Sequence, residues 1–229
     1  MIIVAFHTND PLYNAHCELL KRSAEKLNLS VDVTCIEPSD WLTATAFKAR
    51  FLLDMRKKHT GPILYVDADA FIHSNPKEIL ANYDADIGVH YLNNQELVSG
   101  TLLLNDTQST HKLLENWVAA VAEFPCTWEQ KVLQELINEK LKSGQLSVAH
   151  LPAEFTFIFD ISREQQPLAV PIIEHLQAAR EIRLKKKNNK WFRRLSGIKK
   201  KPNKRLLARR KKVEELAQSV DFVFPFERI

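Results

Sequence analysis

Short apolar runs alternate with longer amphipathic stretches along most of the chain. Short runs bounded by turn-forming residues predict strands, whereas apolar residues spaced three and four apart predict helices. Strands that alternate with helices are typical of an α/β fold with a mostly parallel central sheet flanked by helices. We expect strands at 2–6, 31–36, 63–66, 85–89, 97–105, 145–151, 171–175 and 221–226, and helices at 12–27, 45–58, 76–83, 109–124, 127–141 and 213–220.

The stretch 61–72 contains a predicted strand that ends in two carboxylates. Ile63–Val66 is apolar throughout, follows a Gly-Pro pair and precedes Asp67 and Asp69. Alternation along an extended chain places both carboxylates on one side, at a strand end where open α/β sheets bind ligands. Two close carboxylates repel each other unless a proton or cation intervenes, and a hard divalent cation commonly bridges to phosphate oxygens. The alternative is that both are ordinary polar residues of a loop.

These residues and those around them resemble a known family. Leu64–Ala70 followed by Asn75-Pro76 resembles the DxD segment of nucleotide-sugar glycosyltransferases with the GT-A fold. The resemblance spans roughly residues 1–180 and includes further segments in the family's order, namely Trp41, Lys48, 99–105, 128–130 and His175. It implies a GT-A-like nucleotide-diphospho-sugar transferase fold and a metal-dependent enzyme. The donor would be a nucleotide-diphosphate sugar, with a UDP-sugar as the leading candidate.

The resemblance also implies a metal site. Asp67, Asp69 and His175 would hold Mn²⁺ or Mg²⁺ on the donor diphosphate. An imidazole beside two carboxylates suits Mn²⁺, which accepts nitrogen ligands better than Mg²⁺ does. The alternative for His175 is a structural histidine with satisfied hydrogen bonds.

Other positions are assigned to the donor site by the same resemblance. His7 and Thr8, in the first loop, would hold the nucleoside, although this stretch also fits a routine turn. Trp41 and Lys48 would stand near the donor pocket, where the cation of Lys48 would offset the charge of the diphosphate. The alternatives are that Lys48 is a solvated surface charge and that Trp41 is a core residue. The remaining positions expected to line the donor sugar are Ala68, Ser99 and Gly100.

The segment Trp128–Gln130 carries the candidate catalytic residues. In the resembling enzymes an acidic residue followed by Gln reaches the acceptor or the sugar at this point. Glu129 is therefore the candidate base if the enzyme inverts configuration, with Gln130 beside it. The alternative is that Thr127 caps a helix and Glu129 only complements the helix dipole.

Composition narrows the function classes further. The chain of 229 residues is 45% apolar and has only five glycines, with neither a G-x-G-x-x-G nor a Walker A loop. This argues against a dinucleotide-binding enzyme or a P-loop nucleotidase. We expect no membrane span and no signal peptide, because no apolar run approaches 18 residues and the start of the chain reads as a strand. Cys17, Cys35 and Cys126 lack metal-binding spacing and fit reduced core thiols of a cytoplasmic protein.

The net charge of +4 is unevenly distributed. Residues 1–182 hold 15 Lys and Arg against 24 acidic residues, whereas residues 183–212 hold 16 Lys and Arg and no acid. We therefore divide the chain into a GT-A-like catalytic domain (1–182), a basic helical or flexible module (183–212) and a C-terminal helix and strand that return to the body (213–229). The residues expected to bind a polyanion are Lys187, Lys190, Trp191, Arg193, Arg194, Lys199, Lys200, Arg209 and Arg210.

A basic module on an acidic body suggests a polyanionic acceptor. We favour nucleic acid over an anionic membrane surface, and specifically a hydroxymethylated base in phage-type DNA. The alternatives are transfer to a lipopolysaccharide-type glycan at a membrane, and a non-catalytic nucleic-acid-binding protein on a transferase fold. We expect the protein in the cytoplasm, that of the host if a phage encodes it, or at the periphery of a membrane.

Overall fold

A six-stranded sheet forms the centre of the molecule. The computed structural model describes residues 1–37, 41–188 and 201–226. The strand order is β2 (Val31–Ile36), β1 (Ile2–Thr8), β3 (Ile63–Val66), β6 (Glu96–Leu104), β5 (Ile87–Leu92) and β7 (Val148–His150). Parallel pairs join β1 to β2, β1 to β3 and β5 to β7, whereas β6 is antiparallel to both of its neighbours. The predicted α/β class with a mostly parallel sheet is confirmed.

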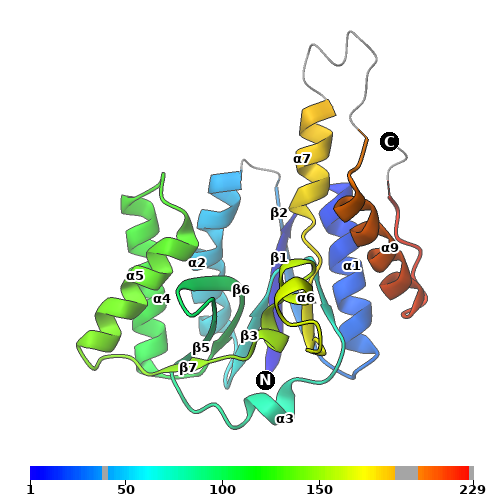
Figure 1. The fold of residues 1–229 in the computed structure, drawn as a ribbon. Coiled ribbons are helices and arrows are strands. Elements are labelled where there is room, and N and C mark those ends of the chain that lie inside the picture. Colours follow the sequence, from blue (N-terminus) through cyan, green and yellow to red (C-terminus); the bar gives the residue numbers. More distant parts are fainter. Residues whose placement is uncertain (38–40, 189–200, 227–229) are drawn as a thin grey trace.

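Helices cover both faces of this sheet (Figure 1). The helices α2 (Trp41–Lys58), α4 (Gln108–Glu123) and α5 (Glu129–Lys142) pack on one face, and α1 (Pro11–Glu25) packs on the other. Successive strand residues point to opposite faces of the sheet. Val4 and Tyr65 pack in the core beneath α2, α4 and α5, whereas their neighbours Ile3 and Leu64 pack in the core on the α1 side. All four side chains are at most 1% exposed, as expected for strands covered on both sides.

A second, three-stranded sheet joins distant parts of the chain. It consists of β4 (Ala70–Ile72), β9 (Ile173–His175) and β8 (Phe157–Ile158), in that order. The short helices α3 (Lys77–Leu80), η1 (Ala153–Thr156) and α6 (Ile161–Gln165) lie in the connecting segments. Because β4 begins directly after Asp69, its antiparallel pairing with β9 places Ala70 opposite His175. This pairing brings a residue more than a hundred positions away next to the two aspartates.

The C-terminal part packs against the body beside α1. The helix α7 (Ala179–Asn188) runs through position 182, the predicted domain boundary, and α9 (Lys204–Gln218) lies along α1 (Figure 1). The C-terminal helix was predicted over 213–220, but it starts nine residues earlier, within the basic stretch. The strand predicted over 221–226 is wrong, because this segment has no strand pairing. Its return to the body is correct, since Phe224 is 7% exposed and packs in the core that α1 and α9 share.

Two smaller predictions also need correction. Among the three cysteines, all of which are free thiols, only Cys17 is buried, whereas Cys35 and Cys126 are exposed. The N-cap of α5 is Trp128 and not the predicted Thr127, and Trp128 forms no side-chain capping bond. None of the helices in the described ranges is long and apolar enough to cross a membrane.

Candidate active site

A cleft of about 460 Å³ lies at the carboxyl ends of β1 and β3. Its walls come from the end of β1, the segment after β3, the middle of β6, the start of α5 and the end of β9. Eleven residues predicted for the donor, metal and catalytic sites line this cleft: His7, Thr8, Lys48, Asp67, Ala68, Asp69, Ser99, Gly100, Glu129, Gln130 and His175. Segments that are far apart in the sequence therefore form one site.

Asp67 and Asp69 lie on a tight turn between β3 and β4. The amide of Ala70 donates to the carbonyl of Asp67 at 2.9 Å, which closes the turn. Both carboxylates face the cleft, as predicted, but the cause is this turn and not alternation along a continuous strand. Tyr65 donates its hydroxyl to Asp67 Oδ1 at 2.6 Å, and the amide of Ala178 donates to Asp69 Oδ2 at 2.7 Å. These bonds fix each carboxylate through one oxygen and leave the other oxygen for a ligand.

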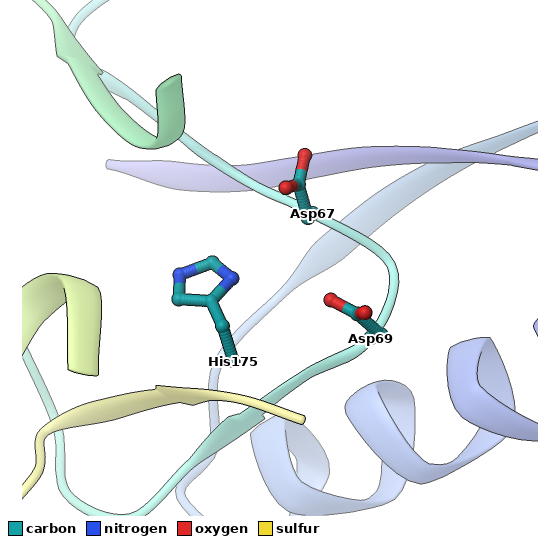
Figure 2. A group of neighbouring side chains, drawn as sticks. All are labelled: Asp67, Asp69 and His175. Atoms are coloured by element: carbon teal, nitrogen blue, oxygen red, sulfur yellow. The ribbon is translucent and has the colours of Figure 1, made fainter. Parts of the chain in front are cut away.

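His175 completes a cluster of three possible metal ligands. One ligand atom each from Asp67, Asp69 and His175 lies within 4.8 Å of the others, and Figure 2 shows the three side chains around one small space. The hydroxyl of Thr101 donates to the carbonyl of Phe155 at 2.7 Å, so it can only accept from His175 Nε2, which is 2.8 Å away. This fixes the proton on Nε2 and leaves Nδ1 with a free lone pair, the form that binds metals.

Gly100 leaves the space in which these ligand atoms meet. A Cβ at this position would lie 3.2 Å from Asp67 Oδ2 and 3.3 Å from His175 Nδ1. The carbonyl of Gly100 accepts a hydrogen bond of 2.9 Å from the amide of Asp67, so the backbone of β6 directly borders the aspartate turn. The close approach predicted for this glycine is a feature of the structure.

The electrostatics of the cluster favour a cation. Burial raises the pKa of Asp69 above its usual value, and the neighbouring charge of Asp67 raises it further. Burial lowers the pKa of His175, which keeps the imidazole neutral at pH 7. Two carboxylates and a neutral imidazole therefore form a site in which negative charge is confined at an energetic cost. A bound divalent cation would remove that cost.

Lys48 lies at the centre of a buried network behind Asp67. Its Nζ is 3.3 Å from Asp67 Oδ1 and 3.3 Å from Glu129 Oε1, and the residue is 6% exposed. Burial alone would lower the pKa of Lys48, but the charges of Asp67 and Glu129 raise it, so the side chain is a buried ammonium group. Lys48 also donates to Ser99 Oγ at 3.1 Å, and the amide of Ser99 donates to Gln130 Oε1 at 3.0 Å. Lys48 is thus not a surface charge.

Several residues that the sequence analysis did not select also line the cleft. Tyr65 could have been found, because it is the one residue with a polar group in the apolar run that precedes Asp67. Tyr13 from α1 and Gln177 from the segment after β9 carry no local signal in the sequence. Only the packing of α1 and β9 around the aspartate turn reveals them.

The structure places two of the predicted polyanion-binding residues elsewhere. Arg209 is fully buried, 3.2 Å from Glu181, and Arg210 is partly buried and pairs with the same carboxylate at 2.7 Å. Because their guanidinium groups are paired with Glu181 within the protein, their assignment to a polyanion is a misreading of the charge run. The other residues predicted to bind a polyanion, together with Trp41, lie outside the described part of the chain. They are the side chains of Trp41 and Lys187, and residues Lys190, Trp191, Arg193, Arg194, Lys199 and Lys200.

Comparisons with known proteins agree with this geometry. The family model of nucleotide-diphospho-sugar transferases matches residues 8–189. Among solved structures, a glycosyltransferase involved in the glycosylation of the major capsid of PBCV-1 is 12% identical, with a TM-score of 0.62 over 80% of this chain and 97% of that chain. The glycosyltransferase GlyE of Streptococcus pneumoniae TIGR4 is 13% identical, with a TM-score of 0.52 over 76% of this chain and 54% of that chain. A search of curated proteins found no match. The chain therefore belongs to the nucleotide-diphospho-sugar transferase family of glycosyltransferases and has a GT-A-like fold.

Proposed function

We propose that this glycosyltransferase is metal-dependent and moves a sugar from a nucleotide-diphosphate donor, with a UDP-sugar as the first candidate, to a hydroxyl on a polyanionic acceptor. The observation that carries the proposal is the convergence of Asp67, Asp69 and His175 beside Gly100 in the cleft. Each carboxylate keeps one oxygen free of the hydrogen bonds that orient it, and His175 keeps Nδ1 free. Oxygen and imidazole ligands of this kind suit Mn²⁺ or Mg²⁺.

The metal's contribution would be charge neutralisation. When bound, it would stabilise the negative charge that develops on the leaving nucleoside diphosphate. Lys48 adds a second positive charge on the same side of the cleft, and its burial in a low-dielectric network strengthens its effect. His7 and Thr8 lie at the end of β1, on the wall of the cleft where the nucleoside would bind.

Glu129 needs a more specific assignment. It is 2% exposed, and its Oε1 is ion-paired with Lys48, so we assign it first to holding Lys48 in place. The role of base predicted for it would need Oε2 to reach the acceptor, and that oxygen is buried without a hydrogen-bond partner. Glu129→Gln separates the two roles. Loss of a base would lower kcat and leave donor binding unchanged, whereas release of Lys48 would weaken donor binding.

The acceptor is assigned from charge. Lys201 and Lys204 are exposed at or on α9, and Arg183 is exposed on α7. Arg205 and Lys211 are exposed as well, and each pairs with a carboxylate at the surface. These side chains support a phosphate-rich acceptor, and DNA with a hydroxymethylated base remains our candidate. A gel shift with duplex DNA should show binding that weakens steeply with salt. Sedimentation with anionic liposomes but not with DNA would favour the membrane-surface glycan instead.

A thermal-shift panel tests the donor site. Nucleoside diphosphates and nucleotide sugars are added to the wild type with Mn²⁺ or with chelator. A true donor raises the melting temperature by mass action only when Mn²⁺ is present. Asp69→Ala should abolish the shift, and Asp54→Ala, which removes an exposed carboxylate paired with Arg50, should not. If no donor shifts the wild type, or if Asp67→Ala leaves the biological function intact, the chain is better described as a non-catalytic binding protein on this fold.

A further inference from the structure

The helix α9 lies beyond residues 8–189, the part of the chain that matches the family, yet it is integral to the body around the site. Val213 and Ala217 are fully buried, and they pack with Ala15 and Leu19 of α1. The residue of interest on this helix is Arg209, which points inward among the apolar side chains. Of the other basic residues of α9, Lys204, Arg205 and Lys211 are exposed, whereas Arg210 and Lys212 are partly buried.

Arg209 is fully buried and has a partner for each part of its guanidinium group. Its Nε donates to the carbonyl of Leu176, one terminal nitrogen lies 3.2 Å from Glu181 Oε1, and the other lies 2.7 Å from His16 Nε2. Burial and the nearby guanidinium lower the pKa of His16 well below its usual value, so His16 is neutral and accepts this bond. Desolvating an arginine in this way is costly, and the cost is offset only if the geometry of its partners is good.

The carbonyl that Arg209 binds belongs to the turn that orients Asp69. The amide of Leu176 donates to the Asp69 carbonyl at 2.9 Å, and the amide of Ala178 donates to Asp69 Oδ2 at 2.7 Å. Between them, Gln177 lines the cleft and has a φ of 59°, a left-handed conformation that is unfavourable for this residue type. Such a conformation persists only where the surrounding contacts fix it.

We propose that Arg209 is a positioning residue for the metal site, which it serves by holding the Leu176–Ala178 turn at the carbonyl of Leu176. Arg209 donates to the carbonyl of Leu176, and the turn itself donates two amides to Asp69, that of Leu176 to its carbonyl and that of Ala178 to its carboxylate. The turn therefore keeps the Asp69 carboxylate aimed at the space shared with Asp67 and His175. The C-terminal helix thereby becomes part of the donor site's framework. This inference rests on the proposed metal-dependent function, but its first readout does not.

The first readout is amide hydrogen exchange in the metal-free protein. Arg209→Met keeps an unbranched apolar stem and removes the guanidinium group, and Arg209→Lys keeps the charge. Val213→Ala loosens the packing of the same helix but leaves the bond from Arg209 to the Leu176 carbonyl in place. We expect the amides of Leu176 and Ala178 to exchange at least tenfold faster in Arg209→Met than in the wild type. In Val213→Ala they should change no more than other amides of the body do. Unchanged exchange at these two amides in Arg209→Met would overturn the proposal.

The second readout is Mn²⁺ affinity, measured by calorimetry on the same variants. A bond from a charged donor has a net strength that corresponds to about a tenfold or larger change in affinity. Arg209→Met should therefore bind Mn²⁺ about tenfold more weakly, with partial rescue in Arg209→Lys. Equal weakening in Val213→Ala would mean that Arg209 only stabilises the fold. If the wild type itself fails to bind Mn²⁺, the proposed function fails, and the exchange data still decide the role of Arg209 in the turn.

Discussion

Gly100→Ala tests the space at the centre of the proposed metal site. The added Cβ would lie 3.1 Å from His175 Cε1, 3.2 Å from Asp67 Oδ2 and 3.3 Å from His175 Nδ1. Contacts this short force the neighbours to move by a few tenths of an ångström. Metal sites tolerate ligand displacements of only about 0.2 Å, so we expect Mn²⁺ affinity to fall by about tenfold or more.

The effect on stability should be smaller than the effect on binding. Gly100 lies in β6 with an ordinary extended backbone, so the substitution restricts the unfolded chain and stabilises by about 0.4–1 kcal/mol. Crowding in a packed site costs about 1–3 kcal/mol. The free energy of unfolding should therefore fall by roughly 0–2.5 kcal/mol, which leaves the protein folded.

Gly88→Ala is the matched control. Its Cβ would lie 3.0 Å from Leu103 Cβ and 3.0 Å from Leu151 Cδ2, which is similar crowding in the same sheet but outside the cleft. Calorimetric titration of both variants with Mn²⁺, together with urea unfolding, separates the two effects. We expect Gly88→Ala to be destabilised and to bind Mn²⁺ as the wild type does. Wild-type affinity in Gly100→Ala would refute the argument that Asp67 and His175 bind one ion beside this glycine.

Three further predictions follow from other contacts. Thr101→Val removes the acceptor of His175 Nε2–H and should weaken Mn²⁺ binding by about 10–100-fold in the same titration; unchanged affinity would mean that this bond does not orient the ring. Asp86→Ala removes hydrogen bonds from two hydroxyls and one amide and should lower the free energy of unfolding at pH 7 by about 1–3 kcal/mol. Burial would raise the pKa of Asp86, but these bonds lower it overall. The stabilisation by Asp86 is therefore present above the usual aspartate pKa and is lost as pH falls through the lower pKa of the folded state. If the difference in unfolding free energy between wild type and Asp86→Ala stays constant in urea unfolding from pH 7 to pH 3, this reasoning is wrong. Lys48→Met leaves Glu129 buried without its cation and should destabilise by about 3–5 kcal/mol, with a smaller donor-induced thermal shift; a wild-type shift would exclude Lys48 from donor binding.

Much of the fold and the two aspartates of the candidate metal site could be predicted because the signals are local. The apolar run Ile63–Val66 identifies a buried strand, and the polar residues after it mark a strand end. The unusual glycine in β6 indicates a close approach of the backbone at position 100. The position of His175 beside Asp69 is a different case, because it depends on the pairing of β4 with β9 and was expected only from the family resemblance.

Other features depend on tertiary contacts that a sequence pattern does not encode. The run Arg209–Lys212 reads as uniformly solvated charge, yet helical geometry turns Arg209 toward α1 and leaves Lys211 in solvent. Similarly, Lys48 and Glu129 lie far apart in the sequence, and their ion pair follows from the packing of α2 and α5 beside the sheet. Charge in a sequence therefore predicts exposure only where no buried partner is available.

Metal-dependent release of nucleoside diphosphate tests whether Asp67, Asp69 and His175 hold a metal ion that acts on the donor. The wild type and Asp69→Asn, which keeps the side-chain shape but removes its charge, are incubated with the nucleotide sugar that gives the thermal shift, and water takes the sugar in place of the acceptor. We predict release by the wild type with Mn²⁺, none with chelator, and a loss of about a hundredfold or more in Asp69→Asn, since the lost stabilisation acts on the leaving diphosphate. Release at the same rate with chelator, or by Asp69→Asn, would contradict metal-dependent transfer at this site.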